Sequence, residues 1–168
     1  AAFLPISVLI ALLSAPAGRW ADRIGPGPLM AAGSALVACA YAGLWWNAGA
    51  GDFWGRVVPC MVLAGAGLGL VVAPLTAAVM QAAEDGEQGA ASGINNAVAR
   101  VAGLIAVALL GQVAARAYGP GPPGFGLAGE GPAHLAATGA AFGSVALIGA
   151  GMAGLAAVLA LATGRRVR

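Results

Sequence analysis

The residues of this chain that could carry out chemistry are few and scattered. Gly149, Gly151 and Gly154 match the GxGxxG spacing of dinucleotide-binding proteins. That motif works where it follows a strand, opens a helix and precedes an acidic residue by about 20 positions. Here it lies inside a long apolar segment that is followed by arginines. We therefore do not expect a nucleotide cofactor.

The sequence also lacks the residue patterns of an enzyme or a metal site. The single histidine, His134, has no metal-ligand partners near it and is interpreted as a plain loop residue. The serines have no base within reach in the sequence, and no carboxylate falls inside a predicted membrane span. Cys39 and Cys60 lie in separate apolar segments, which is typical of small packing residues. We expect no catalysis, no metal and no cofactor.

A charged segment, Gly18-Arg19-Trp20-Ala21-Asp22-Arg23-Ile24-Gly25, separates two apolar runs. Gly18 and Gly25 would let the backbone turn tightly. Asp22 is placed to face a helix N-terminus or an arginine, and the two arginines can reach anionic headgroups. The same pattern also fits a generic basic loop on the cytoplasmic side of a membrane. From the residues alone, both interpretations stay open.

A second polar cluster lies at 92–100, where Ser92, Asn96 and Arg100 are four residues apart and share one helix face, next to Asn95. An arginine at the centre of a membrane span costs about 2.5–3.5 kcal/mol on insertion scales. It must therefore snorkel, pair, or face an aqueous cavity. We favour an Arg100 that faces the helix bundle or a cavity, with snorkelling as the alternative.

Long helices must position these residues. Of the 168 residues, 60% are hydrophobic and 8% are charged, whereas a soluble domain carries about 25% charged residues. About 20 apolar residues are needed to cross a bilayer as a helix. The sequence predicts about five such helices, at 1–16, 29–46, 57–80, 92–115 and 136–162. It therefore predicts an all-α integral membrane protein, and its start inside an apolar run indicates a piece of a longer chain.

The connections between these segments indicate an orientation. They are predicted at 18–27, 47–55, 81–91 and 118–134, the last a Gly- and Pro-rich, exposed and mobile loop. Five arginines fall on the side of the first connection and the tail 164–168, and two, Arg56 and Arg116, fall on the other. Since basic residues concentrate in cytoplasmic loops, we expect a multi-pass protein of the cell membrane with a cytoplasmic C-terminus. The net charge of +2 is too small and dispersed for a nucleic-acid partner.

Small residues are the expected means of helix packing, because helices in a bilayer associate by close contact rather than by the hydrophobic effect. Gly65 and Gly69 in the third segment, and Gly139 and Gly143 in the fifth, have small-xxx-small spacing. We interpret both pairs as close-packing surfaces, with a sliding interface as the alternative.

Three parts of the chain resemble the major facilitator superfamily. The charged segment looks like its cytoplasmic motif G-x-L-a-D-r-x-G, with Trp20 at the aliphatic position and Pro26-Gly27-Pro28 in place of the basic residues that usually follow. The stretches 65–79 and 89–103 are similar to the drug:proton antiporters with fourteen predicted helices. The resemblance implies that the five segments are the last five helices of the C-terminal six-helix bundle. The missing N-terminal half usually holds the proton-coupling acid.

The resemblance implies the C-terminal part of a proton-coupled multidrug or antibiotic efflux transporter that works by alternating access. Its partners would be membrane lipid, the N-terminal half of the same transporter, a small lipophilic substrate and a proton. A major facilitator importer of sugars or organic acids and a non-transporting membrane scaffold subunit are the alternatives. The implied gating residues are Gly18, Asp22, Arg23 and Gly25, and the residues implied to pair across the bundle are Asn95, Asn96 and Arg100.

Overall fold

Long apolar runs fold as helices in a bilayer because a helix satisfies its own backbone hydrogen bonds. The computed structural model describes residues 4–49, 52–84, 86–121 and 123–164, and within these ranges it contains helices and turns but no strand. The predicted all-α class is confirmed. A turn of π-helix at Phe53–Val57 leads directly into the long helix that begins at Val58. The helices are α1 (Leu4–Ile24), α2 (Pro26–Trp46), η1 (Phe53–Val57), α3 (Val58–Gln81), α4 (Gln88–Tyr118) and α5 (Pro132–Gly164).

Four helices of the described chain are long and apolar enough to cross a membrane, which indicates a membrane protein: Pro26–Trp46, Phe53–Gln81, Gln88–Tyr118 and Pro132–Thr163. The first predicted span is not among them. Three charged residues fall in the last turns of α1, so its charge-free part, 4–18, is about 22 Å long, less than the hydrocarbon core of about 30 Å. Residues 1–3 of that predicted span, and Arg165, Arg166 and Arg168 of the tail, lie outside the described residues.

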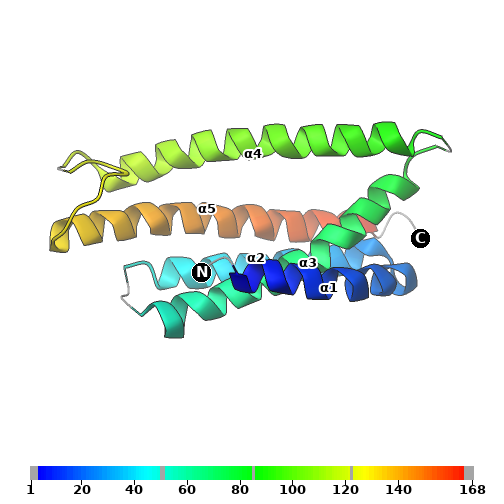
Figure 1. Ribbon diagram of the computed structural model, residues 1–168, viewed down its shortest axis with the longest axis horizontal. Coiled ribbons are helices and arrows are strands. Elements are labelled where there is room, and N and C mark those ends of the chain that lie inside the picture. Colours follow the sequence, from blue (N-terminus) through cyan, green and yellow to red (C-terminus); the bar gives the residue numbers. More distant parts are fainter. Residues whose placement is uncertain (1–3, 50–51, 85, 122, 165–168) are drawn as a thin grey trace.

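The helices alternate in direction along the long axis of the molecule (Figure 1). The α1–α2 turn, the α3–α4 turn and the end of α5 lie together at one end, on the right of the view. We call it the turn end. The α2–η1 and α4–α5 connections lie at the opposite end, which we call the loop end. The alternation that underlies the predicted orientation is therefore present in the structure.

The centre of the bundle is formed by α2 and α3. α2 packs between α3 and α5, and α3 also packs against α1. Within the described residues, α4 approaches only α5 and α3, and it lies on the outer side of the bundle (Figure 1). Only 6% of its most apolar stretch is buried, compared with 33% for α2. α4 therefore exposes most of its apolar surface.

Glycines bring the central helices into backbone contact. A methyl group built at Gly67 of α3 would lie 2.5 Å from the carbonyl oxygen of Gly33 in α2, and one at Gly33 would lie 2.6 Å from the carbonyl of Gly67. Gly65 and Gly69, four residues apart, lie instead against Leu9 of α1. Successive glycines of α3 thus face two different helices. At both interfaces the small residue lets the backbones approach closely, which is how helices associate in a bilayer.

The first connection is shorter than the predicted 18–27. α1 continues through Ile24, and only Gly25 separates it from α2. Gly18 therefore lies inside α1 and is not a turn residue. The helix tolerates it, because a single glycine lowers the stability of a helix by only about 1 kcal/mol. Packing outweighs this cost, since Ala17 and Ala21, one turn apart, are buried on both sides of Gly18.

The other helices also extend beyond their predicted bounds. The connection predicted at 47–55 is shorter in the structure, because η1 begins at Phe53. Asp52, the residue before η1, accepts a hydrogen bond of 2.9 Å from the backbone N–H of Gly55. This side-chain bond satisfies one of the free N–H groups at a helix start. α4 and α5 each extend past the predicted 92–115 and 136–162 at both ends.

Candidate functional site

The charged segment forms the last turns of α1 and the sharp turn into α2. Gly25 has φ 85° and ψ 154°, a region that is essentially restricted to glycine. Its N–H donates to the carbonyl of Ala21 at 2.9 Å, which closes α1, and α2 begins with Pro26 in its first turn. Gly25 and Pro26 together end one helix and start the next, because proline suits a first turn where no N–H bond is needed.

The two faces of this segment differ sharply. Ala17 and Ala21 are buried against Leu29 of α2, with Leu70 of α3 packed beside them. The charged side chains of Arg19, Asp22 and Arg23 are all exposed. The described residues form no ion pair with any of them. No side chain caps the start of α2, so Asp22 does not have the helix-capping contact that the sequence suggested. The charges are therefore free to meet water, headgroups or another part of the protein.

A cavity of about 480 Å³ lies next to this segment at the turn end. The α1–α2 turn forms one wall, and the ends of α3 and α5 form the others through Gln81 and Thr163. The Thr163 hydroxyl already donates to the carbonyl of Leu159 at 2.8 Å. No charged residue lines this cavity among the described residues, so the exposed Asp22 and Arg23 lie outside it.

The polar stripe of α4 lies in the outer half of the structure. Asn95 is half-buried, whereas Asn96 and Arg100 are exposed. In the described chain neither Arg100 nor the two asparagines has a side-chain partner, and α4 does not approach α1. The structure therefore does not bring Arg100 together with Asp22, although both lie on the half of their helices that leads to the turn end.

The depth of Arg100 can be compared with that of Arg116 on the same helix. The two residues are 16 positions apart, so their Cα atoms are separated by about 24 Å along the axis. This is less than the core thickness of about 30 Å. Both side chains must therefore reach outward by a few ångströms, which is within the reach of an arginine. This geometry gives the snorkelling alternative for Arg100 a physical basis.

The second pair of small residues lies where α5 passes the end of α2. A methyl group built at Gly139 would lie 3.2 Å from the Cα atom of Gly49, and one at Gly143 would lie 3.1 Å from the Cβ atom of Ala48. Further along α5, Gly149 of the GxGxxG match lies against the ring of Tyr41. This motif is inside a continuous helix, α5, with no strand before it among the described residues. Of its three glycines only Gly149 packs against another helix, because Gly151 and Gly154 have nothing within 4 Å.

An aromatic cluster at the loop end was not anticipated. The Tyr118 hydroxyl and His134 Nδ1 are 2.9 Å apart and share a hydrogen bond, and Phe125 of the Gly-rich loop lies 6.0 Å from the Tyr118 ring, centroid to centroid. His134 is therefore not a plain loop residue: it lies in the first turn of α5 and ties that helix to the end of α4. A tyrosine and a histidine flanking a Gly/Pro-rich loop were the available signal in the sequence.

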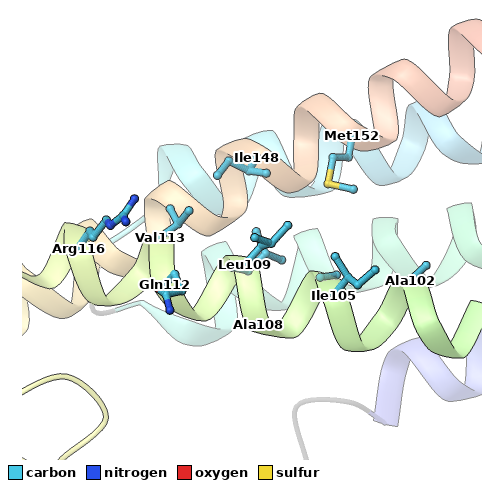
Figure 2. A pocket seen from close by; sticks show the side chains of 11 residues that line it. Ala102, Ile105, Ala108, Leu109, Gln112, Val113, Arg116, Ile148 and Met152 are labelled. Atoms are coloured by element: carbon cyan, nitrogen blue, oxygen red, sulfur yellow. The ribbon is translucent and has the colours of Figure 1, made fainter.

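An open cavity of about 780 Å³ runs between α4 and α5 (Figure 2). Ile105 and Leu109 of α4 line it, and Ile148 and Met152 of α5 lie across from them (Figure 2). Among the described residues, Arg116 is the only charged one that lines this cavity, and it lies at one end of the lining residues of α4 (Figure 2). The cavity is an apolar groove with a cationic end.

The chain matches no model of a known protein family, and no curated protein matches it. The argument for function therefore depends on the motifs of the sequence and on the contacts described above. The strongest of these are the charged end of α1, the glycine contacts of α3 and the exposed polar stripe of α4.

Proposed function

We propose that this chain is the C-terminal part of a proton-coupled efflux transporter of the major facilitator superfamily, which exports lipophilic drugs or antibiotics by alternating access. The observation that carries the proposal is the segment Gly18–Gly25. Its sequence resembles the superfamily's cytoplasmic motif, and it lies at a sharp turn between two long helices with its charges exposed. In this proposal Gly25 sets the turn, and Asp22 and Arg23 stabilise one conformation through contacts with the rest of the transporter.

Three further features support the proposal. The α1–α2 turn and the end of α5 lie at the same end of the bundle, as five consecutive helices of one transporter half require (Figure 1). Gly65, Gly67 and Gly69 give α3 smooth contacts with α1 and α2, which would permit small sliding movements. Arg100 has no partner in the described chain, which suits a residue that faces the missing half or its cavity. The protein would lie in the cell membrane with a cytoplasmic C-terminus.

The test is an efflux assay in cells that express the intact reading frame with Asp22→Asn or Arg100→Ala. We expect cells that express either variant to retain more of a fluorescent lipophilic cation than cells that express the unchanged protein. Glu84→Gln is the matched control, because Glu84 is an exposed acid at the same end but outside the motif. Efflux that is equal in both variants and in the control would remove the site assignment, and intact protein without any efflux would remove the function.

The two alternatives give different results in the same cells. An importer of sugars or organic acids would accumulate a radiolabelled substrate of that class and would not lower the concentration of the lipophilic cation. A membrane scaffold subunit would do neither, and its reading frame would encode few helices beyond those of this chain.

A further inference from the structure

We propose that the groove between α4 and α5 binds one anionic phospholipid of the bilayer, with its phosphate at Arg116 and an acyl chain along Leu109 and Ile105. The lining residues of α4 recur every three or four positions, so they form one continuous face. Ile148 and Met152 of α5 form the opposite wall (Figure 2). This inference does not depend on the transport function, only on the position of the helices in a membrane.

The groove is longer than one leaflet of a bilayer is deep, so one acyl chain would occupy only part of it. From Arg116 to Ala102, the far end of the lining on α4, the helix rises by about 21 Å. Half of the hydrocarbon core is about 15 Å deep. A chain that starts at the headgroup level beside Arg116 would therefore fill the groove to about the middle of the membrane. Arg116 lies two residues before the end of α4 at Tyr118, where the headgroups are expected.

The charge of the groove favours an anion. An arginine guanidinium stays protonated and donates hydrogen bonds in a fork that matches phosphate. Arg116 is exposed, and no described residue forms an ion pair with it. The acids that the structure places at the loop end are Asp52 and Glu130, and neither forms an ion pair with Arg116. Asp52 already accepts a hydrogen bond from the backbone N–H of Gly55. Gln112, one turn before Arg116, adds a second polar side chain to the same end of the groove.

The position of α4 lets a lipid of the surrounding membrane reach the groove. Within the described chain, this helix approaches only α5 and α3, so the groove opens on the outer side of the bundle. Apart from Gln112 and Arg116, the walls of the groove are apolar side chains. A lipid chain is the apolar occupant that a bilayer supplies at a surface that no described helix covers.

The test uses purified full-length protein in phosphatidylcholine vesicles that contain a trace of a phosphatidylglycerol or a phosphatidylcholine probe, each with a photoreactive group midway along one chain. Peptide mapping after illumination should find the phosphatidylglycerol probe on α4 and α5, at residues that line the groove. Arg116→Gln should reduce this labelling about fivefold, the effect of one basic residue near an anionic lipid surface. Arg116→Lys should retain most of it.

The matched control is Arg56→Gln, because Arg56 is the other described arginine at the loop end and lies outside the groove. It should leave the labelling unchanged. Ala106→Trp, which fills the groove, should remove both probes from these residues. Equal labelling by the two probes, unaffected by Arg116→Gln, would overturn the proposal in favour of unselective boundary lipid. Absence of labelling would overturn it in favour of a protein segment covering the groove.

Discussion

At the scale of single residues, the glycines of this chain have three different tasks. Gly33 and Gly67 allow two helices to touch through their backbones, Gly25 adopts a conformation closed to other residues, and Gly151 occupies an ordinary helical position with open space around it. Only the first and second tasks exclude a side chain. Substitutions to alanine should therefore give effects that differ in size and in sign.

Gly67→Ala should destabilise the protein by about 1–3 kcal/mol, the usual cost of overpacking. The added methyl would meet a backbone carbonyl at 2.5 Å, and relief requires a shift of α2 against α3. Thermal unfolding of the purified protein in detergent measures the change. Gly151→Ala is the matched control and should be neutral or stabilising by up to about 1 kcal/mol, because alanine favours helix. Equal unfolding temperatures for the two variants would contradict the described α2–α3 contact.

The two glycines of the charged segment should also respond in opposite directions. Gly25→Ala forces a side chain into a region restricted to glycine and should cost about 1–3 kcal/mol. Gly18→Ala adds a methyl at a helical position with nothing within 4 Å and should be neutral or slightly stabilising. The same unfolding measurement checks both. A comparable loss in the two variants would show that Gly18 is a turn residue, as the sequence suggested, rather than part of α1.

At the scale of elements, the sequence predicted the existence of the helices better than their ends. Charge-free runs locate α2, α3 and α5 because insertion in a bilayer penalises charges inside a span. The end of α1 was missed because glycine and charge were interpreted as a turn, whereas the burial of Ala17 and Ala21 keeps that segment helical. Such burial depends on Leu29 and Leu70, which belong to other helices and cannot be assigned from local pattern.

One side-chain hydrogen bond adds to the apolar contact between α4 and α5 at the loop end. Tyr118→Phe removes the hydroxyl that pairs with His134 while keeping the ring against Ala141 and Phe125. We expect a loss of about 0.5–1.5 kcal/mol locally and faster amide exchange in residues 123–131. Hydrogen exchange followed by mass spectrometry measures it.

The control for this exchange experiment is Tyr41→Phe, since the Tyr41 ring packs against Gly149 at the centre of the bundle, away from the loop. It should leave exchange in 123–131 unchanged. Identical loop exchange in Tyr118→Phe and in the unchanged protein would mean that the hydrogen bond does not order the loop.

At the scale of the whole molecule, the sequence predicted an alternating helical bundle, but it could not predict which helices are neighbours. Small-residue spacing marked Gly65 and Gly69 as packing residues, and the structure places them against α1, whereas Gly33, the partner of Gly67, was not marked. A spacing pattern identifies a face of one helix, but the partner of that face is set by the packing of all helices together. The open groove on α4 likewise emerges only from the arrangement of α4 and α5.

The orientation of the bundle in the membrane can be decided by experiment. Because the helices alternate in direction, cysteine labelling at two positions is sufficient. Ala128 lies in the connection at the loop end, and Gln88 begins α4 at the turn end; both are exposed. In a background in which Cys39 and Cys60 are replaced by alanine, Ala128→Cys should react with a membrane-impermeant maleimide in intact cells. Gln88→Cys should react only after permeabilisation, because the excess of arginines predicts that the turn end is cytoplasmic. The reverse labelling pattern would mean that the protein has the opposite orientation, and it would remove the cytoplasmic assignment of Asp22 and Arg23. Reaction of both in intact cells would contradict the crossing of the membrane by α4.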